Sequence, residues 1–134
     1  MTWKANVLVV ASKTADSDEL LEALRARVAR GPAEFMLVLP QNGTDRTSAL
    51  VALEGALARM REAGLVVTGE VGDCDPLVAV GEAWDPGRFD EVIVSTLPTH
   101  SSRWLLIDLP HRVANLTGAS VTHVVTFPRE LTRS

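Results

Sequence analysis

The sequence alternates short runs of apolar, largely β-branched residues with longer segments whose apolar residues recur at helical spacing. "NVLVVA" at residues 6–11 is a run of the first kind, and "DSDELLEALRARVARG" at residues 16–31 is a segment of the second kind. An uninterrupted apolar run predicts a strand buried on both faces, whereas a spacing of three and four predicts an amphipathic helix. Because helices joining successive strands return the chain to the same end of the sheet, this alternation favours a parallel α/β architecture.

Five strands and four helices can be placed along the chain in this way. The strands are expected at residues 6–11, 34–40, 65–71, 89–95 and 120–127. Right-handed crossovers between them predict a doubly wound, three-layer α/β sandwich with a five-stranded parallel sheet. The expected strand order is 3-2-1-4-5, which is a Rossmann-like arrangement.

Signals at the helix ends and the apolar spacing predict where the helices begin and which side chains face the sheet. Asp16, with Glu19 three residues later, resembles a capping box, and Gly64 is placed to end the second helix. Asp75 is expected to cap the third helix, with Pro76 at its first position. The residues expected to face the sheet from the first two helices are Leu20, Leu21, Leu24, Val28, Leu50, Leu53, Leu57 and Met60.

The fourth helical pattern is interrupted by Pro110. Proline lacks an amide hydrogen and clashes with the preceding turn, so it breaks or kinks a helix. We therefore expect one helical segment over residues 101–108 and the start of another at residues 110–116. Trp104, in the first segment, is interpreted as an anchor in the core, with a stacking surface for a base as the alternative.

Composition and charge describe a globular chain and exclude some classes of partner. Of the 134 residues, 46% are apolar and 22% are charged, so one domain over residues 1–134 is expected. The net charge of −4 argues against nucleic acid, which requires a basic protein face. No apolar run is long enough to span a membrane, and "MTWKANVLVV" lacks the features of a secretory signal. With Cys74 as the one cysteine, a cytoplasmic protein without disulfides is expected.

A ligand site is expected where the strand order reverses, beyond the carboxyl ends of the first and fourth strands. The loops at that point are residues 11–17 and 95–103. Their hydroxyl and cationic side chains suit a small anion held at a helix start. A loop whose hydroxyls bond only to one another is the alternative. The candidate ligand-binding residues are Ser12, Lys13, Thr14, Ser95, Thr96, Thr99, Ser101, Ser102 and Arg103.

Serine hydrolase chemistry is a further alternative for the second loop. Ser95, Ser101 or Ser102 could serve as nucleophile, with His100 or His111 as the base. The sequence has no G-x-S-x-G elbow, however, and identifies no orienting acid. Hydroxyl residues before a helix more often cap it. No catalytic residue is therefore assigned, and an enzyme is the less favoured expectation.

Metal binding is not indicated by the spacing of the possible ligands. The three histidines and Cys74 share no recognised ligand pattern. Asp73 and Asp75 could hold Mg²⁺ through a bound phosphate, but a role at the helix start explains them more simply. The sequence therefore predicts no metal site.

Residues 70–125 resemble a known family in the order and spacing of their parts. "EVGDCDPLVAVGEAW" supplies a glycine-aspartate-proline loop and a helix, and "FDEVIVS" supplies a strand that runs into a loop. "RWLLIDLPHRVANLTGASVTHVV" supplies a helix and a final valine-rich strand. The chain is similar in this order to the universal stress proteins, almost from end to end. The resemblance implies the adenine nucleotide alpha hydrolase-like form of the Rossmann-like fold.

The resemblance also implies where ATP would bind. Family members that bind ATP carry the motif G-x2-G-x9-G-[ST] after the fourth strand, and its glycines let backbone amides approach the phosphates. A gap-free alignment places Ser95, Pro98, Asp108 and Leu109 at these positions, and none of them matches. Pro98 has no amide hydrogen, and Asp108 would set a carboxylate near the phosphates. The resemblance therefore implies a member without strong ATP binding, and no cofactor is expected.

The expected function is that of a universal-stress-type binding or regulatory module. The main alternative is a divergent member that binds a nucleotide or another small anion through a rebuilt loop at residues 95–103. The strand at residues 120–127 lies at a sheet edge and contains no lysine, glutamate or internal proline, the residues that usually protect an edge. Universal stress proteins commonly dimerise through this strand, so the resemblance implies a homodimer.

Overall fold

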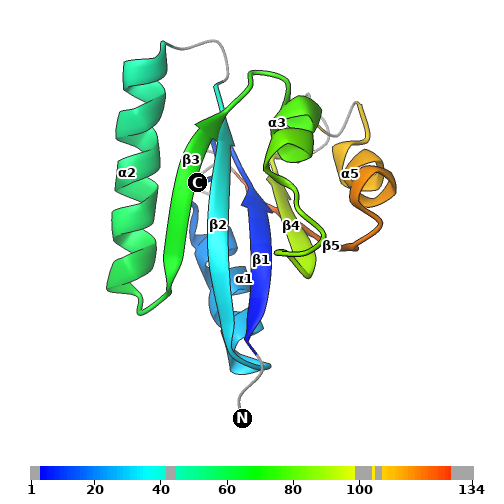
Figure 1. Ribbon diagram of the computed structural model, residues 1–134. Helices are drawn as coiled ribbons and strands as arrows, with labels where there is room; N and C mark the ends of the chain where they lie inside the picture. Colours follow the sequence, from blue (N-terminus) through cyan, green and yellow to red (C-terminus); the bar gives the residue numbers. More distant parts are fainter. Residues whose placement is uncertain (1–3, 42–44, 99–103, 105–106, 128–134) are drawn as a thin grey trace.

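The structure is a computed structural model that describes residues 4–41, 45–98, 104 and 107–127 (Figure 1). Strands and helices alternate along the chain, and each expected strand is present with ends shifted by no more than a few residues. The elements are β1 (Ala5–Val10), α1 (Asp18–Ala29), β2 (Ala33–Pro40), α2 (Arg46–Glu62), β3 (Val67–Gly72), α3 (Pro76–Ala83), β4 (Glu91–Thr96), α5 (Leu109–Thr117) and β5 (Ser120–Val125).

The strands form one parallel sheet in the order β3-β2-β1-β4-β5. The predicted fold class and strand order are therefore confirmed. β1 lies at the centre, where Val7 is opposite Phe35 of β2 on one side and Glu91 of β4 on the other. The carboxyl ends of β1 and β4 are thus neighbours at the point where the strand order reverses, which is where such sheets bind ligands.

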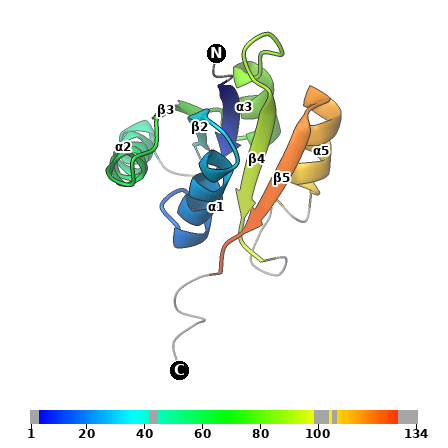
Figure 2. The ribbon, with the colours of Figure 1, turned by 90° about the horizontal axis from the view of Figure 1, so that it is seen from below.

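Helices cover both faces of the sheet. α1 and α2 pack on one face, and α3 and α5 pack on the other (Figure 2). Side chains along β4 alternate between the two cores: Ile93 packs in the core that contains Leu20, whereas Val92 and Val94 pack in the core that contains Val80. Because both faces are buried, the central strands need apolar side chains at consecutive positions, which explains their continuous apolar runs.

The ends of α2 and α3 agree with the sequence signals. Gly64, just after α2, has a φ of +88°, a conformation that a glycine adopts without steric cost. The Oδ1 atom of Asp75 accepts a hydrogen bond from the amide of Leu77 at 2.9 Å, and Pro76 occupies the first turn of α3. Both predicted boundaries are confirmed.

The start of α1 differs from the prediction. Ser17, and not Asp16, is the capping residue, and its Oγ accepts a hydrogen bond from the amide of Leu20 at 3.1 Å. Glu19 does not close a capping box, since its Oε2 accepts a hydrogen bond from the amide of Phe127 at 3.3 Å. The predicted capping box is therefore wrong, because a serine one residue later supplies the shorter side chain that reaches the first turn.

The buried face of α2 is also rotated relative to the prediction. Leu53, Leu57 and Met60 are buried as expected, but Leu50 is 40% exposed. Ala49 and Ala56 are buried in its place. Small side chains let α2 approach the sheet closely, and a rule based on large apolar residues does not detect them. On α1, Val28 is likewise exposed at its edge.

The predicted start of a new helix at Pro110 is confirmed to within one residue, whereas most of the segment predicted at residues 101–108 lies outside the described residues. α5 begins at Leu109 and carries Pro110 in its first turn, where the missing amide hydrogen is not needed. The preceding residue, Asp108, has the left-handed conformation (φ 55°, ψ 50°), and its side chain makes no capping hydrogen bond. Trp104 is partly buried and packs against the core beneath α3 and α5, as its interpretation as an anchor requires.

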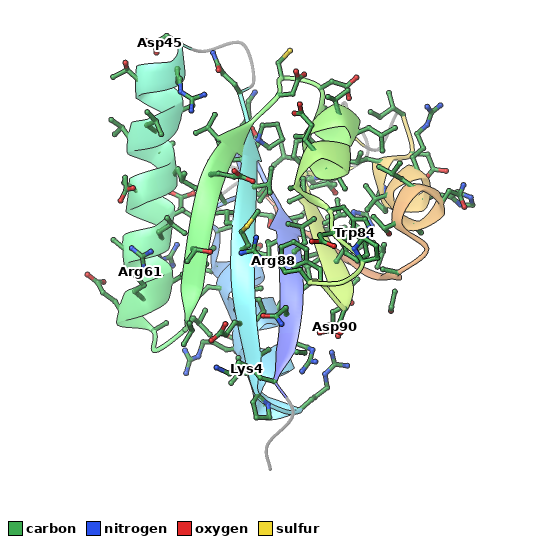
Figure 3. The ribbon with its side chains drawn as sticks, in the orientation of Figure 1. Lys4, Asp45, Arg61, Trp84, Arg88 and Asp90 are labelled. Atoms are coloured by element: carbon green, nitrogen blue, oxygen red, sulfur yellow. The ribbon has the colours of Figure 1, made fainter. Side chains whose placement is uncertain are left out.

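The edge of the sheet at β3 is partly covered. In a parallel sheet, successive residues point their backbone groups alternately toward the neighbouring strand and away from it. The amide of Phe35 bonds to the carbonyl oxygen of Val66, so Val67 and every second residue after it face outward. Arg61 at the lower end of α2 donates to the carbonyl oxygen of Val67 through Nε and Nη2, at 3.2 and 3.0 Å (Figure 3).

The edge at β5 is more open. The amide of Thr126 bonds to the carbonyl oxygen of Thr96 at 2.8 Å, which fixes the residues of β5 that face β4. The residues that face away, here called the outer row of β5, are Val121, His123 and Val125. Among the described residues, no side chain bonds to the backbone of this row. The backbone amides on either side of this row are already bonded. The amide of Ala119 donates to Thr117 Oγ1, and the amide of Phe127 donates to Glu19 Oε2.

Candidate functional site at the ends of β1 and β4

The candidate residues of the first loop lie in consecutive tight turns after β1. The amide of Ala15 donates to the carbonyl oxygen of Ser12, and the amide of Ser17 donates to that of Thr14, both at 3.1 Å. Ser12 is half-buried, Lys13 is exposed and Thr14 is buried. Lys13 is therefore the candidate of this loop that an anion in solution can reach most directly.

A buried pair of hydroxyl groups joins the two loops. Thr14 Oγ1 lies 2.7 Å from Ser95 Oγ at the end of β4. The two residues are only 3% and 1% exposed. Because each hydroxyl satisfies the other in a place that solvent does not reach, the pair links the strand ends instead of offering two free hydroxyls to a ligand. The structure thus brings two candidate residues together in a closed contact.

We expect the Thr14–Ser95 pair to behave as one energetic unit. Ser95→Ala or Thr14→Val should each lower the free energy of unfolding by about 1–3 kcal/mol, because each leaves a buried hydroxyl without its partner. The double variant should cost clearly less than the sum of the two single changes. Urea unfolding of the four proteins measures this coupling, with Ser12→Ala in the half-buried part of the same loop as the control. Additive effects would contradict the pairing.

Thr96 points to the opposite face of β4 and pairs with His123 of β5. Thr96 Oγ1 lies 2.7 Å from His123 Nε2, and Thr96 is 2% exposed. Partial burial of the imidazole lowers the pKa of His123 below its ordinary value, since desolvation disfavours the charged ring. The sequence analysis did not predict this contact. The signal lies in the strand register: Val94 is opposite His123, so the imidazole shares a face with Thr96.

A second hydroxyl pair ties the start of α1 to the end of β5. Ser17 Oγ, which caps α1, lies 3.0 Å from Thr126 Oγ1. Thr126 is 5% exposed. The contact lies at the same end of the sheet as the Thr14–Ser95 pair. At this end, described hydroxyls of the loop after β1 therefore bond to the last residues of β4 and β5.

The four positions that align with the glycine motif have distinct environments. Ser95 and Pro98 are buried, and Leu109 is the fully buried first residue of α5. Asp108 is exposed and has a φ of 55°. Glycine adopts this left-handed conformation most easily, and aspartate is one of the few other residues that tolerate it. The backbone shape of a glycine therefore persists at residue 108, combined with a carboxylate.

The remaining candidates, Thr99, Ser101, Ser102 and Arg103, lie outside the described residues, as does His100. Their proposed contact with an anion stays a prediction. The described part of the site supplies one exposed cation, Lys13, and three hydroxyls that bond to other side chains, those of Thr14, Ser95 and Thr96.

Hydrolase and metal chemistry receive no geometric support from the described residues. Ser95 bonds to Thr14 and not to a histidine, while His111 Nδ1 lies 4.0 Å from Asp108 Oδ2 at the exposed start of α5. Within the described part of the chain, no three His, Cys, Asp or Glu residues are grouped to hold a metal ion. Cys74 is exposed. None of the helices in that part is long and apolar enough to cross a membrane.

Comparison with solved structures identifies the fold. A universal stress protein from Archaeoglobus fulgidus superposes with a TM-score of 0.63 at 17% sequence identity, over 90% of this chain and 93% of that one. The chain has the universal stress protein fold. A universal stress protein in complex with cAMP superposes with a TM-score of 0.62 at 21% identity, over 94% of this chain and 99% of that one.

No protein-family model matches the chain, and no curated protein matches it significantly. The likeness to universal stress proteins is therefore one of fold.

Proposed function

We propose that this chain is a universal-stress-type binding or regulatory module that does not bind ATP strongly. The observation that carries the proposal is the buried Thr14–Ser95 contact. Ser95 aligns with the first glycine of the ATP motif, and its side chain fills the space that a glycine leaves open. Pro98 removes an amide donor, and Asp108 adds a negative charge close to where phosphates would lie. Three features thus oppose a triphosphate at this place.

Mg-ATP is expected to bind with a dissociation constant no tighter than about 1 mM. Isothermal titration calorimetry with Mg-ATP measures this directly. The matched variant is Asp108→Gly, because the left-handed backbone at this residue suits glycine and the substitution removes the carboxylate without moving the chain. Its affinity should be higher than that of the wild type, though still weak. A micromolar constant for the wild-type protein would contradict the proposal.

A second candidate is a module that binds a small nucleotide or another anion. The similarity to a universal stress protein in complex with cAMP favours it, since cAMP carries one phosphate and does not require a cradle for three. Exposed Lys13 of the first loop and Arg103 of the second supply positive charge for such a ligand. Native mass spectrometry of the purified protein tests for a retained nucleotide. A bound cAMP that is lost in Arg103→Ala would establish this candidate over the first.

The proposed module is a cytoplasmic homodimer that pairs through residues 120–127. Support comes from the outer row of β5, whose backbone groups bond to no side chain among the described residues. An unpaired row of this kind is a template for another strand, and a two-fold axis lets the same strand of a second copy complete both rows. The exposed side chain of Phe127 beyond β5 adds apolar surface to this edge.

A further inference from the structure

The residues on either side of the outer row of β5 select one way of aligning the two β5 strands in the proposed dimer. In an antiparallel pair, facing residues exchange both backbone hydrogen bonds. Setting Val121 opposite Val125 of the partner subunit, and His123 opposite His123 of the partner subunit, pairs every residue of both outer rows. Any shifted alignment brings Ala119 or Phe127 into the pairing, and the amides of these two residues are already bonded within the subunit.

This alignment brings two imidazoles together. Directly opposite residues in an antiparallel pair lie on the same face of the sheet, with Cα atoms about 5.5 Å apart when they are hydrogen-bonded. The two His123 residues would therefore lie directly opposite each other across the two-fold axis, with their side chains on the same face of the sheet. Each would also keep its 2.7 Å contact with Thr96 of its own subunit.

Among the described residues, the groups around His123 offer no compensating negative charge. On its face of the sheet, β4 contributes Val92, Val94 and Thr96, none of which is charged. The titratable or charged side chains of α5 and its cap are Asp108, His111 and Arg112, all exposed. Partial burial, and no neighbouring charge, lowers the pKa of His123. In this alignment, the titratable group directly opposite His123 is His123 of the partner subunit.

We propose that a second copy of this chain docks on the outer row of β5 in the alignment that sets the two His123 residues opposite each other, and that protonation of this pair separates the subunits. The inference rests on the proposed homodimer. It adds how the two β5 strands are aligned and how protonation controls their association. Two positive charges on directly opposite residues, whose Cα atoms would lie about 5.5 Å apart, repel each other.

The direction of the pH dependence follows from the neutral state of the rings. The pKa of His123 lies below the ordinary value of 6.5 in the single subunit, and the facing imidazole lowers it further in the dimer. Dimer formation therefore favours the neutral form of both His123 imidazoles. The affinity between subunits is fully present above the pKa of His123 in the free subunit and is lost as the pH falls from that value through the lower pKa of His123 in the dimer.

Sedimentation equilibrium at pH 8 and pH 5.5 tests the proposal. The dissociation constant of the wild-type dimer should rise at least about tenfold at the lower pH. His123→Gln keeps an amide that can bond to Thr96 but cannot be protonated, so its dissociation constant should change little. His111→Gln on α5 is the matched control and should retain the wild-type pH dependence.

Cross-linking tests the alignment independently of pH. In a Cys74→Ser background, His123→Cys should form an interchain disulfide on mild oxidation, because a Cα separation of about 5.5 Å suits the bond. Ser120→Cys, far from the axis in this alignment, should not. A wild-type protein that is monomeric at pH 8 overturns the β5 dimer itself. A dimer with equal affinity at both pH values, or one that does not cross-link through residue 123, overturns the alignment and leaves the dimer standing.

Discussion

Replacing Val125 with proline is expected to turn a dimer into monomers. The amide of Val125 belongs to the outer row of β5, so proline removes a donor that faces the partner while the bonds between β5 and β4 remain. Each dimer loses two hydrogen bonds of about 1 kcal/mol each, which should raise the dissociation constant about thirtyfold. Light scattering at micromolar concentration and pH 8 measures the change.

The control for Val125→Pro is Val71→Pro on the opposite edge. Val71 is also half-buried, and its amide also faces outward, at the β3 edge. The Val71→Pro substitution should therefore leave the molar mass in solution unchanged. Circular dichroism confirms that both variants keep the wild-type fold. The dimer surface is misplaced if Val71→Pro dissociates the protein and Val125→Pro does not.

Leu109→Ala is expected to lower the free energy of unfolding by about 2–5 kcal/mol. Leu109 is the first residue of α5, has no exposed surface and packs in the core beneath α3 and α5. Truncation leaves a cavity where the chain emerges from the left-handed turn at Asp108, so the surroundings cannot easily collapse into it. Thermal unfolding should show a midpoint lowered by about 10 °C.

Leu116→Ala on the same helix is the matched control for Leu109→Ala. Leu116 is 49% exposed, so its truncation should cost less than about 1 kcal/mol. The comparison separates loss of packing from loss of leucine in a helix, since both changes have the same helix propensity. Equal costs for the two variants would mean that α5 is not anchored through its first residue.

The fold could be predicted because the central strands are buried on both faces, and such strands need apolar residues at consecutive positions. "VLVV" in β1 has no polar position, so the sequence leaves little choice of element or layer. Leu50 was misplaced because alanines, not leucines, let α2 approach the sheet at that point. The start of α1 was misplaced because Asp16 and Ser17 are both good caps, and only the path of the chain after β1 selects between them.

The place of the candidate site in the fold could be predicted from the sequence, but the contacts of its residues could not. The reversal of strand order between β1 and β4 predicts that the loop containing Thr14 lies near Ser95. Whether these hydroxyls face a ligand or each other depends on sub-ångström placement of the two strand ends, which no spacing rule specifies. The Thr96–His123 contact depends on the alignment of β4 with β5, a property of the assembled sheet.

The unequal edges of the sheet limit how far chains of this kind can assemble. A pair joined through β5 forms one continuous sheet whose two outer ends are both β3. There, Arg61 occupies the carbonyl of Val67, and the glycines at positions 69 and 72 weaken the strand as a template. In the proposed dimer, pairing uses the more open β5 edges and leaves the partly covered β3 edges, so we expect growth to stop at two subunits and not to continue into a filament.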